Sequence, residues 1–310
     1  MNPAAPDPPS GTALDAQHPW PGLWSYAEEN EPWFRGRDRE RAELLALVQR
    51  EPLCVLFGVS GLGKTSLLRA GLFPELRRRD ALPVPIRLDL ASAVPLADQV
   101  LAAFTEATRL HAPSAPVPRE GETLWEFFHR RAPDAADFVL WSPENSRLTP
   151  VLVFDQFEEI FTHATDPAAR ARVREFIGQF AALVQNVTPP AVRERLEADA
   201  ALRGAFSFEP APVRVLLSLR EDFVAELEGL RTHLRAVATC RLRLLPLSGL
   251  QALDVVEKNG RNSSTRVSAR RSSAPSPRSS AAGTSPRSLP GSRSPSWPLI
   301  PRSSASCSAS

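Results

Sequence analysis

The stretch that most constrains the fold of this chain runs from Leu53 to Leu68. Within it, Gly58, Gly63, Lys64 and Thr65 satisfy the pattern G-x-x-x-x-G-K-[ST] of a phosphate-binding loop, the Walker A motif. An apolar run precedes the loop, as expected for a buried parallel strand, and apolar residues follow it at a helix start. The stretch therefore predicts a strand, a loop and a helix within an α/β protein.

Each position of the loop has a chemical task. Glycines allow successive backbone N–H groups to converge on an anion. Lys64 brings a positive charge to the β- and γ-phosphates of a nucleotide, and the Thr65 hydroxyl is a ligand for Mg²⁺. The helix adds its positive N-terminal end. We expect the nucleotide to contact Gly58, Val59, Ser60, Gly61, Leu62, Gly63, Lys64, Thr65 and Ser66.

A second motif follows at Val151 to Asp155, where four apolar residues end in an aspartate. This is the Walker B pattern, a buried strand whose tip presents a carboxylate to Mg²⁺. On a helix, Glu158 and Glu159 would return to the side of Asp155, so that one of them polarises the attacking water. The pattern does not distinguish the two glutamates. The alternative is a capping box, with Asp155 as N-cap and Glu158 reaching back.

Arg220 ends another predicted strand, Val213 to Arg220. The two-residue period of a strand places Ser218 and Arg220 on one face. If this strand lies between the two Walker strands, Arg220 faces the γ-phosphate and distinguishes ATP from ADP. The alternative is an ion pair between Arg220 and Glu221 or Asp222.

The order of predicted elements indicates the fold class. Five strands alternate with helices, and each motif lies at the carboxyl end of a strand, where α/β sheets bind ligands. The other two strands are expected at Val84 to Leu90 and Leu242 to Leu247, whereas residues 132–149 are expected to be irregular. Helices are expected after the Walker A loop and over residues 96–110, 122–131, 170–187, 190–202 and 250–256.

Aromatic residues gather before the first strand. Trp20, Trp24 and Trp33 lie close together, and the turn formed by Phe34, Gly36 and Arg37 follows. One interpretation places this turn beside the adenine, with aromatic and backbone contacts to the base. The other is a cap over the edge of the core.

Composition excludes several classes of protein. Three cysteines far apart in the sequence predict neither a disulfide framework nor a metal site. No apolar run is long enough to span a membrane and no signal peptide is recognisable, which predicts a soluble, cytoplasmic protein. Residues 1–256 carry 28 basic against 34 acidic side chains, so the predicted folded part is mildly acidic. It shows no basic patch of the kind that binds nucleic acid.

The chain resembles the novel STAND P-loop NTPases, which are AAA+-related signal-transduction ATPases with numerous domains. The resemblance covers about residues 17–256. It is carried by Trp20 to Leu23, Phe34 to Glu40, Gly58 to Leu72, Asp155 to Phe161, Ser218 to Phe223 and Pro246 to Ser248. It implies a three-layer P-loop sandwich whose mainly parallel, five-stranded sheet is of the AAA+-like type.

The resemblance also implies the chemistry of the site. ATP or ADP would bind with Mg²⁺, Thr65 and Asp155 would hold the metal, and Arg220 would be the sensor-1 arginine. The module would switch between a compact ADP state and an open ATP state that engages protein partners or self-associates. In related AAA+ enzymes a catalytic glutamate directly follows the Walker B aspartate. Gln156 occupies that position here, which implies a weak ATPase that acts as a slow timer.

The ends of the chain depart from this module. Residues 1–16 are rich in proline and are expected to be disordered, and residues 17–256 to form the NTPase domain. Residues 257–310 form a Ser/Pro/Arg-rich tail where the family continues into helical and winged-helix regions. We expect this tail to be disordered, or to be the out-of-frame product of a GC-rich gene.

Two other functions remain open at the level of the sequence. One is a constitutive P-loop ATPase or kinase that acts on a small substrate and turns over steadily without a partner. The other is a nucleotide-dependent interaction scaffold without useful hydrolysis.

Overall fold

The computed structural model describes residues 14, 18–132, 134 and 136–259. The chain divides into two units, Met1–Ser268 and Ala269–Ser310, and every described residue belongs to the first. The segments expected to be disordered, residues 1–16 and 257–310, lie almost wholly outside the described residues, so those expectations stay predictions.

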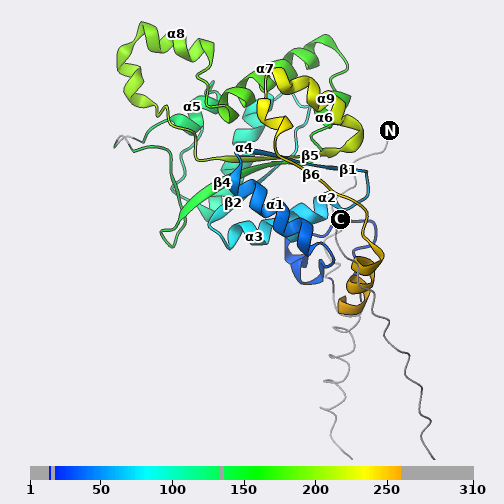
Figure 1. The fold of residues 1–310 in the computed structure, drawn as a ribbon. Coiled ribbons are helices and arrows are strands. Elements are labelled where there is room, and N and C mark those ends of the chain that lie inside the picture. Colours follow the sequence, from blue (N-terminus) through cyan, green and yellow to red (C-terminus); the bar gives the residue numbers. More distant parts are fainter. Residues whose placement is uncertain (1–13, 15–17, 133, 135, 260–310) are drawn as a thin grey trace, which may run out of the picture. The chain divides into compact units, whose positions relative to one another are not determined.

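The centre of the first unit is a mainly parallel sheet (Figure 1). Five parallel strands lie in the order β2-β4-β5-β1-β6, and β3 pairs antiparallel with β4. The order confirms the predicted α/β fold with its AAA+-like sheet, and it places β5 between the two Walker strands, β1 and β4. The strands are β1 (Leu53–Gly58), β2 (Ala81–Ile86), β3 (Leu140–Trp141), β4 (Arg147–Phe154), β5 (Arg214–Arg220) and β6 (Arg241–Arg243).

Helices cover both faces of this sheet, which confirms the three-layer sandwich. One face carries α1 and the helix after the Walker A loop, and the other carries α4, α5 and α7. The helices are α1 (Asp38–Arg50), α2 (Lys64–Ser66), α3 (Phe73–Arg77), α4 (Leu96–His111), α5 (Leu124–His129), α6 (Glu159–Thr162), α7 (Pro167–Val184), α8 (Pro190–Ala198) and α9 (Val224–Gly229). A π-helical turn (Leu67–Leu72) joins α2 to α3, and a further helix spans residues 249–259.

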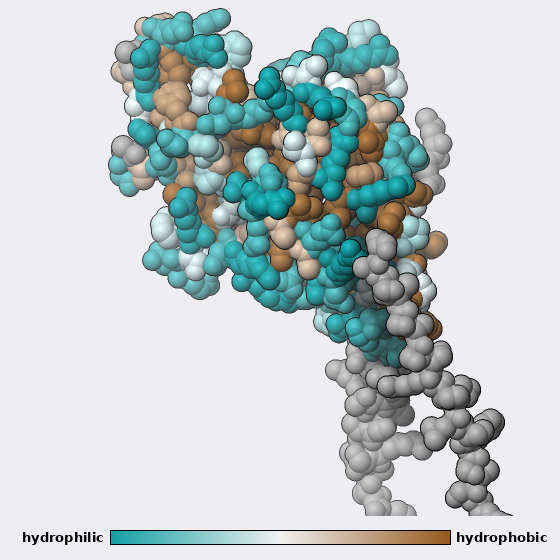
Figure 2. Space-filling view, viewed as in Figure 1, coloured by the Kyte–Doolittle hydropathy of each residue, from teal (hydrophilic) through white to brown (hydrophobic). Residues whose placement is uncertain are grey.

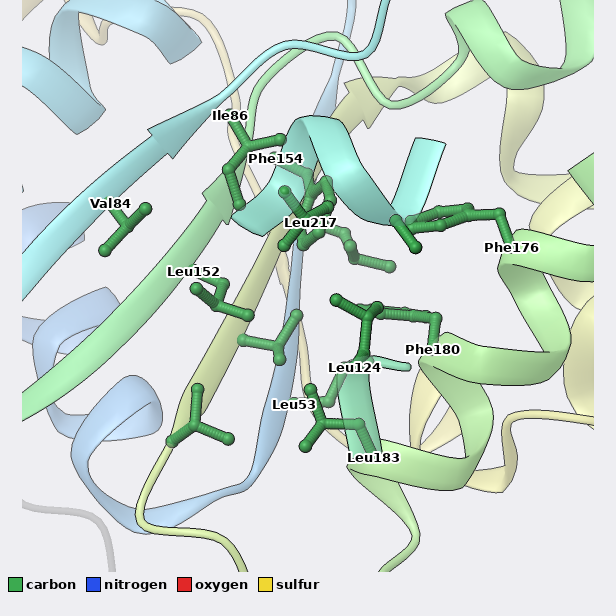
Figure 3. Close-up of a cluster of buried hydrophobic side chains, with 14 of the residues drawn as sticks. Leu53, Val84, Ile86, Leu124, Leu152, Phe154, Phe176, Phe180, Leu183 and Leu217 are labelled. Atoms are coloured by element: carbon green, nitrogen blue, oxygen red, sulfur yellow. The ribbon is translucent and has the colours of Figure 1, made fainter. Parts of the chain in front are cut away.

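The larger core lies between the sheet and α4, α5 and α7. Figure 3 shows Leu53, Leu152 and Leu217 of the strands facing Phe176 and Phe180 of α7. These side chains are almost completely buried. The smaller core, beneath α1 and the Walker A helix, contains the alternate strand residues. Both faces of the strands are thus buried, which explains their continuous apolar runs.

Several elements differ from the sequence-based expectation. β6 covers Arg241–Arg243 where Leu242 to Leu247 were expected, and α8 ends at Ala198, earlier than predicted. β3 lies within the stretch expected to be irregular, because a two-residue strand is too short to show a period. β2 begins at Ala81, earlier than predicted, and contains Pro83 and Pro85. Pro83 and Pro85 lie two residues apart, so the two missing N–H groups belong to the same side of β2. Because β2 is an edge strand, that side can face away from β4.

The surface shown in Figure 2 is mostly hydrophilic, and its hydrophobic side chains lie in separate patches. No helix in the described part of the chain is both long and apolar enough to cross a membrane.

Candidate nucleotide-binding site

The Walker A loop leaves β1 at Gly58 and enters α2 at Lys64. Gly61 and Gly63 have positive φ angles of 82° and 86°. A Cβ atom on either would meet no atom within 4 Å, so the glycines are required by the backbone conformation. The structure therefore supplies the strand, tight loop and helix that the motif predicts.

Lys64 lies across this loop. Its Nζ donates hydrogen bonds to the carbonyl oxygens of Gly58 at 2.8 Å and Val59 at 3.2 Å. Burial lowers the pKa of Lys64, because the charged ammonium loses hydration there. An anion in the loop would offset that loss, so a phosphate fits this arrangement.

Gly58 is required for a different reason, the close approach of the segment after β6. A Cβ on Gly58 would lie 2.7 Å from the carbonyl oxygen of Leu244, whose N–H donates to the Phe57 carbonyl at 2.8 Å. Because the Leu244 carbonyl oxygen is a backbone atom held by this strand pairing, it cannot move away from a new Cβ at low energetic cost.

We expect Gly58→Ala to destabilise the protein by about 1–3 kcal/mol through this overlap. The matched control is Gly178→Ala in α7, where a new Cβ meets no atom within 4 Å. Alanine there is expected to be neutral or stabilising by up to about 1 kcal/mol, because it favours a helix. Urea denaturation of the two variants measures both effects, and equal midpoints would contradict the packing argument.

Asp155 follows β4 and links the two Walker motifs. Its Oδ2 accepts a hydrogen bond from Thr65 Oγ1 at 2.7 Å, and its Oδ1 accepts from Ser218 Oγ at 3.0 Å and from the Gln156 N–H at 3.1 Å. Helix α6 begins only at Glu159, so Asp155 is not its N-cap.

The Thr65 and Asp155 pair fits a Mg²⁺ ion. The expected metal ligands are brought together, and Mg²⁺ is commonly held by one carboxylate together with phosphate oxygens and water. Among the described residues, no group of three or more His, Cys, Asp or Glu side chains could hold a metal by itself. Water and phosphate oxygens would supply the remaining ligands of a Mg²⁺ ion bound here.

The structure separates Glu158 from Glu159. Glu158 is buried, and its Oε2 accepts a hydrogen bond from the Arg220 N–H at 3.3 Å. Glu159 forms an ion pair with Arg87, which follows β2, at 2.6 Å. One carboxylate is thus directed toward β5 and the other toward β2, on opposite sides of β4.

The environment of Glu158 changes its acidity. Burial raises the pKa of its carboxyl, while the Arg220 N–H and the positive charge of Lys64 act in the opposite sense. Lys64 is thus close enough to act on the Glu158 carboxyl, whereas Glu159 is paired with Arg87. Of the two glutamates, Glu158 is therefore the better candidate to act on a water molecule beside a bound phosphate.

This raised pKa predicts a pH dependence. A general base must be ionised, so we expect single-turnover ATP hydrolysis to fall as the pH drops through a value above the usual range of a glutamate, about 4.3. The negative charge of a bound γ-phosphate would raise the pKa of Glu158 further. The Glu159→Gln variant is the control and should keep the profile. A rate that stays constant down to the usual glutamate pKa would contradict this assignment.

Arg220 lies at the end of β5, between the two Walker strands as predicted, but its side chain is half exposed. The guanidinium forms an ion pair with Asp222 and lies 5.6 Å from the centroid of the Phe223 ring. The local ion pair considered as the alternative is thus present. Contact with a γ-phosphate would require Arg220 to exchange Asp222 for the phosphate.

Arg37 is buried between three parts of the chain. Its Nη1 donates to Glu40 and to the Leu245 carbonyl, both at 2.8 Å, and its Nη2 donates to the Leu62 carbonyl at 3.2 Å. The guanidinium therefore ties the Walker A loop to α1 and to the segment after β6. These bonds indicate that Arg37 supports the position of the loop.

The neighbouring Gly36 packs against helix 249–259. Its φ angle is +78°, and a Cβ would lie 2.4 Å from Val255 Cγ2. The Gln251 amide donates to the Gly36 carbonyl at 3.0 Å. Phe34 packs edge-on against Tyr26, with ring centroids 5.7 Å apart.

The aromatic residues surround a cavity of about 290 Å³ beside the Walker A loop. Leu62, Gly63 and Ser66 of the loop reach it directly, and Tyr26 donates its N–H to Ser66 Oγ at 3.1 Å. This is the candidate site for the base. The aromatic and aliphatic lining residues are Trp20, Trp24, Tyr26, Trp33, Phe34, Leu247 and Val255.

A second cavity, of about 340 Å³, reaches the Thr65 and Asp155 pair. Thr65 and Asp155 form one wall, and Trp24, Arg69 and Arg87 contribute others. Sequence reasoning missed the roles of Arg87 and Gln251. Arg87 follows a strand that prolines interrupt, so the sequence does not place it. The periodicity of the helix that contains Gln251 predicts the helix but not the contact of Gln251 with Gly36.

These features define the class of protein. A Walker A loop follows β1, its threonine is bonded to the Walker B aspartate, and the sheet has the AAA+-like order, so the fold is that of a P-loop NTPase. The family model described as novel STAND NTPase 1 matches residues 19–290. The chain belongs to this family.

Three archaeal solved structures are among those similar to this chain. A Walker-type ATPase of Pyrococcus abyssi is 12% identical with a TM-score of 0.42, covering 76% of this chain and 59% of that one. Cdc6p of Pyrobaculum aerophilum is 17% identical with a TM-score of 0.40, covering 73% and 49%. The ORC2 protein of Aeropyrum pernix is 12% identical with a TM-score of 0.44, covering 76% and 54%. The chain thus spans less than two thirds of each. No curated protein sequence matches significantly.

Proposed function

We propose that the chain is the ATP-binding, slowly hydrolysing switch module of a bacterial signal-transduction regulator. The observation that carries this proposal is the bond between Thr65 Oγ1 and Asp155 Oδ2, which joins the two Walker motifs at 2.7 Å. That pair, with Lys64 beside it, matches the donors and charges that Mg²⁺ and a triphosphate need. We propose a cytoplasmic setting, with protein partners or self-association in the ATP state and no nucleic-acid ligand.

Each residue has a defined part in this proposal. Bound Mg–ATP supplies a phosphoanhydride bond whose terminal phosphate is open to attack by water. Lys64 neutralises phosphate charge, while Thr65 and Asp155 hold the metal. Glu158 orients the water and accepts its proton. Arg220 senses the terminal phosphate by leaving Asp222.

Two features favour slow hydrolysis. Gln156, in the position that follows the Walker B aspartate, has a φ angle of +57°, a conformation uncommon for residues other than glycine. It has no carboxylate to act as a base. Glu158 stands three residues from Asp155, and its burial favours the protonated form, which cannot accept a proton from water.

Calorimetric titration of the full chain with ADP and with ATP, each with and without Mg²⁺, tests the proposal. We expect both nucleotides to bind at a single site, and Mg²⁺ to strengthen ATP binding. Absence of binding by either nucleotide would overturn the proposal.

The second cavity favours one alternative, phosphoryl transfer to a small acceptor. Its 340 Å³ volume reaches Thr65 and Asp155, and Arg69 in its wall would attract an anionic molecule. A kinase would hold ATP until an acceptor is added and then turn over repeatedly. An interaction scaffold would bind nucleotide and self-associate without measurable hydrolysis.

A further inference from the structure

Two of the three cysteines of the chain meet in the core although 185 residues separate them in the sequence. The Sγ atoms of Cys54 and Cys240 lie 2.8 Å apart. Both side chains are buried, with exposed fractions of 1% and 3%, and both are free thiols.

The backbone holds these two residues side by side. Val55 of β1 pairs with Arg241 of β6 in parallel register. Cys54 and Cys240 each precede one of these residues, so they lie opposite each other. The Val55 N–H donates to the Cys240 carbonyl at 2.9 Å. Neighbouring strands lie about 4.8 Å apart, which is within the Cα separation that disulfides span.

We propose that Cys54 and Cys240 are a site of disulfide formation that locks β6 and the segment after it onto the Walker A strand. A peroxide is the oxidant. The sulfur of one thiolate attacks a peroxide oxygen, the O–O bond breaks and a sulfenic acid forms, while the departing hydroxide takes up a proton. The second sulfur then attacks the first, the S–S bond forms, and the S–O bond breaks to release water. Two electrons pass from the sulfurs to the peroxide.

Peroxide reaches a buried thiol when β6 leaves β1, and the disulfide forms when β6 returns. The thiolate is the reactive form, and burial raises the pKa of both thiols, so the packed pair reacts slowly. β6 is a three-residue edge strand, which is a segment suited to local opening.

Hydrogen bonds connect the Walker A loop to the segment that follows β6. The Leu244 N–H is bonded to Phe57, and Arg37 bonds both the Leu245 carbonyl and the Leu62 carbonyl of the loop. A nucleotide that orders the loop would therefore hold β6 closed and slow oxidation. This part of the inference rests on the proposed function.

The test uses the full chain with Cys307→Ser, so that only the proposed pair remains. The protein is treated with hydrogen peroxide, denatured, alkylated and digested. We expect a peptide that links Cys54 to Cys240, with the loss of two hydrogens, in a monomeric protein. Alkylation of both thiols after treatment, or only intermolecular disulfides, would overturn the proposal. Cys240→Ser is the control and should give no linked peptide.

The same reaction with ADP and Mg²⁺ tests the coupling. We expect saturating nucleotide to slow disulfide formation at least about fivefold, by reducing the open population. An unchanged rate in a protein that binds ADP would overturn the coupling. If ADP does not bind, the proposed function fails, and the linked peptide still decides the disulfide proposal.

Discussion

The Lys64→Ala variant is expected to bind ADP and Mg–ATP at least about 100-fold more weakly than the parent chain. Hydrogen bonds to charged groups contribute about 1.5–3 kcal/mol each, and a tenfold change in affinity corresponds to about 1.4 kcal/mol. Lys64 also loses hydration in the loop, so its interaction with phosphate is little weakened by competing water. Calorimetric titration of parent and variant measures the change.

The chain contains a matched control for this substitution. Its only other lysine, Lys258, is half exposed and forms an ion pair with Asp254 at 2.8 Å. Lys258→Ala removes the same charge and should leave nucleotide affinity within about twofold, because exposed ion pairs contribute little. Equal affinity of Lys64→Ala and the parent chain would show that nucleotide binds elsewhere.

The Glu158→Gln variant is expected to keep its affinity for Mg–ATP and to lose hydrolysis by about 100- to 10,000-fold, the usual contribution of a general base. The substitution preserves size and one carbonyl oxygen that can accept from the Arg220 N–H. Single-turnover hydrolysis of bound, radiolabelled ATP gives the rate, and titration gives the affinity.

Glu159→Gln separates the two glutamates. It breaks the half-exposed pair with Arg87, which is expected to cost less than about 1 kcal/mol and to slow hydrolysis less than about tenfold. If Glu159→Gln were the slower variant, the assignment of Glu158 as the base would be wrong.

Stability provides an independent check on Glu158. Its folded-state pKa is raised, so the folded protein binds the proton more tightly than the unfolded chain does. The stabilisation that protonated Glu158 contributes is fully present below the pKa of the unfolded state, about 4.3. It is lost as the pH rises through the pKa of the folded state. At neutral pH, Glu158→Gln removes the buried charge and should raise the urea midpoint. A lower midpoint would contradict the burial argument.

The main elements of the fold and both Walker motifs could be predicted from the sequence because they are local. The strands are continuous apolar runs, and the loop has fixed residue types at fixed spacing. The two-residue period of β5 predicts that Ser218 shares a face with Arg220, and the structure adds that Ser218 Oγ donates a hydrogen bond to Asp155. β3 and the start of β2 were not predicted, because a two-residue strand has no period and prolines interrupt β2.

The details of the site depend on contacts between distant parts of the chain. Glu158 and Glu159 are adjacent in the sequence and were equivalent there, and only the positions of Arg87 and Arg220 separate them. The role of Arg37 follows from the carbonyls of Leu62 and Leu245, which any residue would supply. The cysteines gave no signal at all, since their contact depends on how β6 pairs with β1.

If the chain is a slow nucleotide switch, as we propose, its turnover without a partner must be limited. Single-turnover hydrolysis by the purified full chain, with Mg–ATP at less than the protein concentration, measures this, followed by the same assay with excess ATP. We expect ATP to be retained and hydrolysed slowly and once, and the ADP to stay bound. Steady hydrolysis of several ATP molecules per minute without a partner would contradict the proposal.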